Sequence, residues 1–138
     1  MRRLVIAAVM AMLASLLFAP AAYAGSPHFV GTTSITRADT SLTATGKIAG
    51  LGNEDQVQVQ LTATAQCVNP GSNKPQAGNK QSLAAEGTFP VQNGKANFTL
   101  TATATFQPSC SPPMTVEFTD VMVTDLTHNI SQSIPGTF

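Results

Sequence analysis

Polar and apolar residues alternate along two segments of this chain. In the segment Asp55 to Cys67 every second residue from Val57 onward is apolar, and the residues between them are Gln or Thr. Ala96 to Gln107 repeats the alternation, with Asn, Thr and Gln at the polar positions. A period of two places apolar side chains on one face of a β-strand and polar side chains on the other. Both segments are therefore predicted to be strands that cover an apolar core.

Weaker strand patterns occur at four other places. Ser41 to Ile48 alternates and is followed by a glycine-rich turn. Thr115 to Thr124 also alternates, but its apolar residues change parity beyond Asp120. Such a change predicts a β-bulge or a strand that passes from one sheet to the other. The remaining weak strands are expected at 28–36 and 126–134.

Turn signals separate these strands. Asn93-Gly94 lies between the segments 84–91 and 96–106, and Asn-Gly is a strong hairpin signal because both residues tolerate positive φ. The two segments are therefore predicted to be antiparallel neighbours. Two stretches dense in Gly, Pro, Asn and Ser, 69–80 and 107–113, are predicted to be loops.

About seven short strands with turns between them predict an all-β fold, an antiparallel sandwich of immunoglobulin-like type. The chain has no Trp and a single Tyr. It therefore lacks the buried Trp and the tyrosine corner of the immunoglobulin family, and membership of that family is not indicated.

The first 24 residues differ in composition from the rest of the chain. Two arginines precede an apolar run, which ends in a proline and an Ala-Tyr-Ala step at Ala24. This order is typical of a helical secretory signal peptide and predicts cleavage between Ala24 and Gly25. An uncleaved anchor is the alternative, because the run approaches the shortest spanning length of about 17 residues. Cleavage would leave one β-sandwich domain, 25–138, secreted or periplasmic and without stable membrane insertion.

Cys67 and Cys110 are the two cysteines of the chain. In an exported protein an even cysteine count predicts a disulfide bond. This bond would close a loop of about 44 residues, for which the chain-entropy model gives about 4 kcal/mol of stabilisation. Residues 25–138 contain slightly more acidic than basic residues. A weakly acidic chain offers no electrostatic basis for binding nucleic acid.

Several short runs resemble small exported bacterial proteins of unknown function. These runs are Gly46 to Asn53, the Val-x-Val-x-Leu-Thr-Ala-Thr segment that follows, Cys67 to Gly71, and the Cys-Ser-Pro step at Cys110. The resemblance covers roughly residues 40–125 and involves turn and strand residues. It implies a bacterial origin and a disulfide-bridged β-sandwich, and it implies no activity.

The part predicted to be exported, residues 25–138, contains few side chains suited to catalysis. Nucleophilic catalysis needs a Ser or Cys beside a base, and only His28 and His128 could serve as that base. No Gly-x-Ser-x-Gly or Ser-x-x-Lys motif is present. The chain is therefore predicted not to be an enzyme and to need no cofactor. An enzymatic role would gain support only if His128 titrated abnormally beside a carboxylate.

Two kinds of binding site are also disfavoured. Glu117, Asp120, Asp125 and His128 could ligate a metal, but along a strand they alternate between faces. They are interpreted as solvated charges at strand ends, so no metal site is predicted. Carbohydrate sites usually use exposed Trp or Tyr rings, and residues 25–138 contain neither. Carbohydrate is therefore a disfavoured partner.

The polar faces of the predicted strands are almost free of charge. Gln58 and Gln60 represent one such face, and Thr101 and Thr103 represent another. Rows of Thr-x-Thr are similar to the faces of ice-binding proteins, and neutral faces also suit self-association, which we place ahead of ice binding. The simplest alternative is that Thr is a good polar strand former.

The resulting hypothesis is an exported, non-catalytic binding or structural module of the cell envelope or medium. Its partner would be an unidentified protein or a second copy of the chain. The alternative is an inhibitor of an extracellular enzyme that presents one of its two loops, 68–80 or 107–114, on a rigid scaffold. The residues of the first loop that would make the contact are Ser72, Asn73, Lys74 and Pro75.

Overall fold

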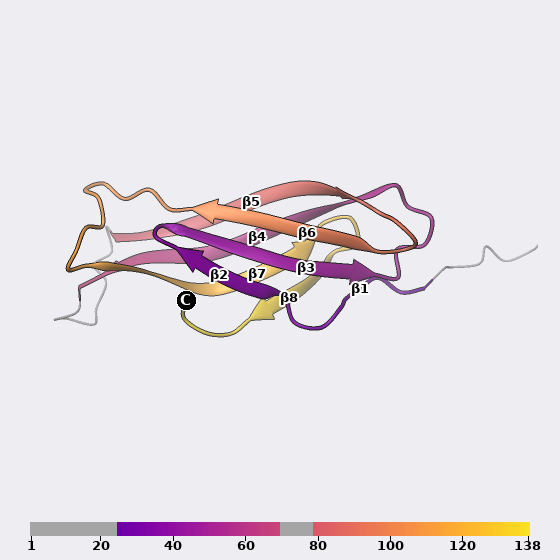
Figure 1. Cartoon of the computed structure of the whole chain (residues 1–138), viewed down its shortest axis with the longest axis horizontal. Helices are drawn as coiled ribbons and strands as arrows, with labels where there is room; N and C mark the ends of the chain where they lie inside the picture. Colours follow the sequence, from indigo (N-terminus) through magenta and orange to yellow (C-terminus); the bar gives the residue numbers. More distant parts are fainter. Residues whose placement is uncertain (1–24, 70–78) are drawn as a thin grey trace, which may run out of the picture.

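The computed structural model describes residues 25–69 and 79–138, which form two antiparallel sheets packed face to face (Figure 1). The strands are β1 (His28–Phe29), β2 (Ser34–Ala38), β3 (Ser41–Ala49), β4 (Gln56–Val68), β5 (Lys80–Pro90), β6 (Ala96–Thr103), β7 (Thr115–Asp125) and β8 (Ile130–Ile134). The predicted β-sandwich is confirmed, with eight strands in the described ranges where about seven were expected. The proposed signal segment lies outside the described residues. Within the described ranges, no helix is long and apolar enough to cross a membrane.

The first sheet is built around β3. This strand pairs with β6 along its whole length, from Ser41 opposite Thr103 to Ile48 opposite Ala96. On its other side β3 pairs first with β2 and then, near its end, with β1. The two short strands therefore lie one after the other along a single edge of β3, which explains why the pattern at 28–36 is weak.

The second sheet has the order β5-β4-β7-β8. Between β4 and β7 the register shifts by one residue, because Thr62 lies opposite Met122 while Thr64 lies opposite Thr119. The additional residue falls at Asp120, whose φ is 53°. Of the two alternatives that the change of parity left open, the structure shows the β-bulge, and it turns both Phe118 and Val121 toward the core, each with 0% exposure.

The core fills the space between the two sheets. Apolar side chains at alternate positions of β3, β4, β6 and β7 are buried there, and the largest are Phe98 and Phe118. The edge strand β5 contributes less, since only Leu83 is buried on it. Gly46 leaves room for Phe98, because a Cβ atom at that position would lie 2.5 Å from the ring.

The turn at Asn93-Gly94 is confirmed and the strands that flank it are neighbours, but they form no continuous backbone ladder with each other. Both residues have positive φ, 52° and 74°, and Gln92 and Lys95 exchange backbone hydrogen bonds across the turn. Beyond this bridge each strand pairs with a different partner, since β5 pairs with β4 and β6 pairs with β3. The hairpin therefore connects the two sheets instead of extending one of them.

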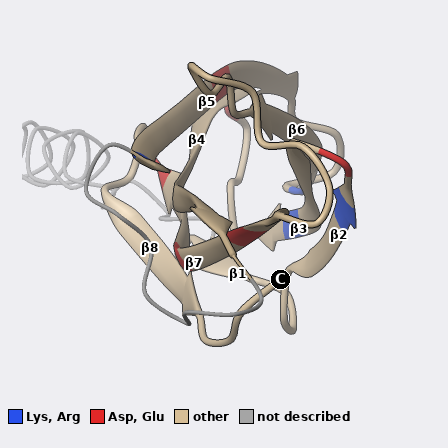
Figure 2. Cartoon of the chain, turned by 90° about the vertical axis from the view of Figure 1, so that its left-hand side faces the viewer, with Lys and Arg blue, Asp and Glu red and all other residues tan. Residues whose placement is uncertain are grey.

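Glutamine side chains join the sheets at both sides of the sandwich. The amide of Gln81 on β5 bonds the backbone N–H and C=O of Thr105, which follows β6. On the opposite side Gln132 of β8 accepts from the N–H and the hydroxyl of Thr33, and it donates to the carbonyl of Gly31. Each glutamine side chain thus supplies hydrogen bonds between the two sheets at a place where their strands make no backbone pairs. Figure 2, which looks along the strands, shows the sheets curving around the interior.

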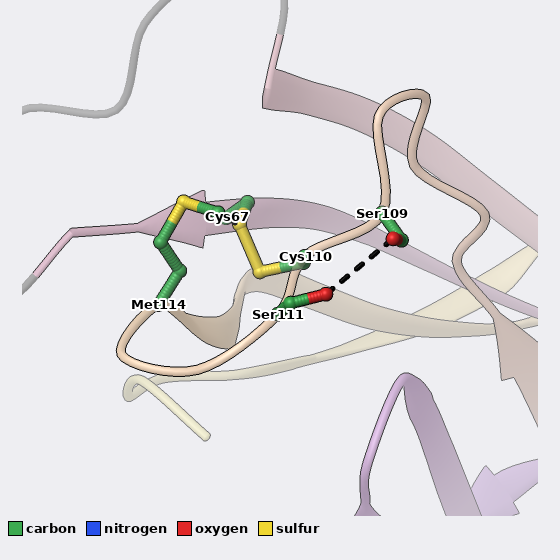
Figure 3. Close-up of a disulfide and its surroundings, with 5 residues drawn as sticks. All are labelled: Cys67, Ser109, Cys110, Ser111 and Met114. Atoms are coloured by element: carbon green, nitrogen blue, oxygen red, sulfur yellow. Dashed lines mark hydrogen bonds between the residues drawn. A yellow bond between two sulfur atoms is a disulfide. The ribbon is translucent and has the colours of Figure 1, made fainter.

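A disulfide bond lies at one end of the sandwich. Cys67, near the end of β4, is bonded to Cys110 in the segment between β6 and β7, with a Cα–Cα distance of 5.7 Å. Met114 places its sulfur 3.8 Å from that of Cys67 (Figure 3). The segment 107–114 is thereby fixed to the end of β4, as the cysteine pattern predicted.

Candidate functional site

The predicted interaction residues lie on two different surfaces. Gln58 and Gln60 belong to β4 and point outward from the second sheet, whereas Thr101 and Thr103 point outward from β6 in the first sheet. The two outer faces are therefore separate candidates, and they differ in chemistry.

The outer face of the first sheet is a grid of hydroxyl groups. Strand register aligns the outward residues of β2, β3 and β6 in three rows, which we call the hydroxyl face. The rows are Ser34–Thr45–Thr99, Thr36–Thr43–Thr101 and Ala38–Ser41–Thr103. Only Ala38 in this grid lacks a hydroxyl group. The grid repeats about every 4.8 Å across the strands and about every 6.8 Å along them.

Hydrogen bonds link the hydroxyl groups of β3 and β6 within each row. The Oγ–Oγ1 distance is 2.9 Å for Ser41 and Thr103, and the Oγ1–Oγ1 distances are 2.8 Å for Thr43–Thr101 and 3.4 Å for Thr45–Thr99. Each hydroxyl has one donor and two acceptor sites, so capacity to bind a partner remains after these bonds form. The grid contains no charged residue, and Lys47 follows only in the next row, opposite Asn97.

The outer face of the second sheet combines glutamines with carboxylates. Gln58 and Gln60 donate their side-chain amides to Glu86 of β5 at 3.1 and 2.7 Å. Gln66 donates to Glu117 of β7 at 3.4 Å. These glutamines are thus occupied by neighbours on their own sheet, which leaves this face acidic and less available than the hydroxyl face.

A histidine lies between two carboxylates at the end of the sandwich opposite the disulfide. Nδ1 of His128 is 2.7 Å from Oδ2 of Asp125, and Nε2 is 2.9 Å from Oε1 of Glu54. Asp125 is fully buried at the end of β7, while Glu54 is 40% exposed in the loop before β4. The other carboxylate oxygen of Asp125 accepts the backbone N–H groups of Thr127 and His128. The residues therefore tie the β7–β8 turn to the β3–β4 loop.

The two carboxylates set the protonation of the ring. Burial lowers the pKa of His128, but the hydrogen bonds that the ring donates to Asp125 and Glu54, together with the negative charges of the two carboxylates, raise it by more. The resulting pKa lies above the ordinary value of 6.5. The pKa of His128 thus departs from its ordinary value beside two carboxylates. Both ring nitrogens are already engaged, however, so the arrangement holds two segments together and offers no free nitrogen to activate a nucleophile.

The four residues considered as metal ligands do not converge. Asp125 and His128 are in contact, but Glu117 bonds Gln66 and Asp120 bonds Thr119. Within the described ranges, no group of three or more His, Cys, Asp or Glu residues is arranged to hold a metal ion. The partner that sequence reasoning missed is Glu54. It lies 74 positions before His128, and no local pattern connects the two residues.

The structure describes one of the two candidate loops in full. Ser72, Asn73, Lys74 and Pro75 lie outside the described residues. The segment 107–114 is described, and the disulfide at Cys110 and the bond from the Met114 N–H to the Ser111 carbonyl hold its second half. One candidate loop is therefore anchored on the scaffold by a covalent bond.

An open pocket of about 600 Å³ has Glu54, the residue that contacts His128, in its wall. Its walls are the β3–β4 loop, which contributes Asn53 and Glu54, and the β5–β6 hairpin, which contributes Asn93 and Lys95. A backbone bond from Leu51 N–H to the Gly94 carbonyl holds these two walls together. Glu54 is therefore shared between the pocket and the contact with the histidine.

Comparison with known proteins finds no protein-family model, no curated protein and no solved structure that matches this chain. The resemblance to small exported bacterial proteins therefore remains a prediction. The surface chemistry described above is the basis for a functional proposal.

Proposed function

We propose that this chain is an exported, non-catalytic β-sandwich that acts through its surface, as a structural module of the cell envelope or medium. The hydroxyl face is its contact surface, and a second copy of the chain is its partner. The observation that carries this proposal is the uncharged grid of serine and threonine hydroxyls across β2, β3 and β6. Export, a bacterial origin and immunoglobulin-like topology belong to the proposal, and the Cys67–Cys110 bond supports an oxidising compartment.

Self-recognition follows from the chemistry of the hydroxyl group. A hydroxyl both donates and accepts, so a face made of hydroxyls is complementary to an identical face turned by a two-fold rotation. Charged residues would have to be matched by opposite charges on the partner, and the grid contains none. Two copies can therefore meet on this face without repulsion between like charges.

The expected affinity is low. Strong protein interfaces concentrate their binding energy in buried Trp, Tyr and Arg side chains, and the hydroxyl face has none of these. We expect a dissociation constant on the order of 0.1 to 1 mM. Such an interface would form mainly where many copies are held close together, as on a cell surface.

The test is sedimentation of the exported form, residues 25–138, over a wide concentration range. The variant Thr101→Lys places a charge on the hydroxyl face, while Thr88→Lys makes the same change on the exposed outer face of β5. We expect the wild type and Thr88→Lys to associate, and Thr101→Lys to stay monomeric. A wild type that remains monomeric at millimolar concentration contradicts self-association. If that monomeric protein slows ice recrystallisation, the hydroxyl face is still the contact surface, but it binds ice and not a second copy.

The anchored loop supports a second candidate, an inhibitor of an extracellular enzyme. The disulfide fixes the segment 107–114 to the end of β4, and a rigid loop loses little entropy when it binds. The test is a panel of extracellular proteases and glycosidases, assayed with the wild type and with a variant whose residues 107–109 are replaced by glycine and serine. Inhibition by the wild type alone would support this candidate, and absence of inhibition throughout the panel would remove it.

A further inference from the structure

The contact between His128 and its two carboxylates requires a particular protonation state. A neutral imidazole carries a proton on one nitrogen only, whereas the imidazolium ion carries one on each. Ionised Asp125 and Glu54 can only accept hydrogen bonds. Both contacts, at 2.7 and 2.9 Å, are therefore hydrogen bonds only while the ring is charged.

Loss of the proton affects the two carboxylates differently. Asp125 is fully buried and receives two backbone N–H groups as well, so it cannot move into water. The neutral ring therefore keeps its remaining proton on Nδ1, facing Asp125. The lone pair of Nε2 then faces Glu54 at 2.9 Å, which is repulsive. Glu54 is 40% exposed and can turn into solvent.

We propose that Glu54, His128 and Asp125 form a proton-controlled latch, which holds the β3–β4 loop against the β7–β8 turn while the ring is charged and releases it when the ring is neutral. Other bonds limit the movement to part of the loop. Leu51 is buried and its N–H bonds Gly94, so this end of the loop stays in place. The Glu54 N–H also bonds the Leu51 carbonyl, and the Asp55 carbonyl accepts the Val91 N–H, so the release frees chiefly the Glu54 side chain, whose surroundings the amides of 53–55 report.

The release also changes the open pocket beside the latch. Glu54 forms part of its wall, and Lys95 of the β5–β6 hairpin lines the same pocket. Released Glu54 would place an unpaired carboxylate in that pocket. Asp55 is the remaining charged group on the loop, and β4 presents only neutral Gln58 to the turn, through a bond from its N–H to Thr127 Oγ1. His128 is therefore the group in this cluster whose proton controls the contact.

The direction of the pH effect follows from linkage. The pKa of His128 is higher in the folded chain than in the unfolded one, so the latch contributes its full stabilisation below about pH 6.5. This stabilisation is lost as pH rises through the folded-state pKa. The loop is thus held in acidic surroundings and released in alkaline ones.

The test is an NMR titration of the exported, disulfide-bonded form from acidic to alkaline pH. The ring signals of His128 report its protonation, and the backbone amides of 53–55 report the loop. We expect His128 to titrate above the ordinary histidine value of 6.5, and the loop amides to shift with the same midpoint as His128.

The variant Glu54→Gln tests whether protonation of His128 controls the loop or has no effect on it. Removing this exposed carboxylate should lower the His128 midpoint and abolish the matching titration of the loop amides. Asp55→Asn is the matched control, because it removes a neighbouring carboxylate that does not contact the ring, and both effects should persist in it. Loop amides that ignore the His128 titration, or a midpoint unchanged by Glu54→Gln, would overturn the proposal.

Discussion

The two ends of β4 are held in place by different chemistry. Near its last residues Cys67 is bonded covalently to Cys110. At its beginning Gln58 bonds the β7–β8 turn, where His128 is paired with Asp125 and Glu54. The covalent end does not respond to pH in the ordinary range, whereas the ionic end depends on one proton. One strand thus combines a permanent attachment with a conditional one, and neither uses the hydroxyl face.

Removing the disulfide should have the largest effect on stability. The double variant Cys67→Ala and Cys110→Ala opens a loop of about 44 residues and should lower the free energy of unfolding by about 4 kcal/mol. Residues 25–138 contain no Trp or Tyr, so urea unfolding is best followed by far-ultraviolet circular dichroism. We expect the same loss at pH 6 and at pH 8.5. A loss below about 1 kcal/mol would show that the disulfide contributes little to the free energy of unfolding.

Removing the charge of Asp125 at the ionic end should lower the free energy of unfolding by less than removing the disulfide does. Asp125→Asn keeps the size of the side chain but removes the charge that pairs with His128, and hydrogen bonds to charged groups contribute about 1.5 to 3 kcal/mol. We expect a loss of about 2 kcal/mol at pH 6 in the same urea experiment. Asp120→Asn is the control, since it changes an exposed carboxylate on the same strand and should stay within about 0.5 kcal/mol of wild type.

The pH dependence should then distinguish the two ends. Because the pKa of His128 is raised in the folded chain, the urea midpoint of the wild type should fall as pH rises from 6 to 9. In His128→Gln this part of the decline should disappear, while the disulfide variant should retain it. The same decline in the wild type and in His128→Gln would assign the pH effect to another group.

The smallest effect is expected for a single bond at the ionic end. Thr127→Val removes the hydroxyl that accepts the N–H of Gln58. Because Thr127 is exposed, water can partly replace this bond, and we expect a loss of about 0.5 to 1 kcal/mol. Hydrogen exchange at the Gln58 amide should accelerate in this variant. An unchanged exchange rate would mean that the β4–β7 pairing alone protects this position.

Local patterns in the sequence were sufficient to predict several features of the fold. Alternation identified β4 and β6, and the change of parity beyond Asp120 predicted either a bulge or a change of sheet, of which the structure shows the bulge. Each of these signals lies within one strand. The two cysteines also predicted their own bond, since an exported chain with only two of them has one possible pairing.

Contacts between distant strands could not be predicted in the same way. The hairpin at Asn93-Gly94 suggested that its flanking strands pair, but the turn alone does not determine which sheet each strand joins. The pairing of β4 with β7 places Val59 opposite Asp125, and this register brings Glu54 to His128. The hydroxyl face likewise depends on the alignment of β2, β3 and β6, which no single segment encodes.

The central claim is that the hydroxyl face is the surface through which copies of this chain meet. The most direct test is a set of NMR spectra of residues 25–138 recorded from low to millimolar concentration. We predict concentration-dependent shifts confined to the outward residues of β2, β3 and β6, centred on Thr43 and Thr101. Shifts on the outer face of β4 and β5, or no shifts over the whole range, would contradict the claim.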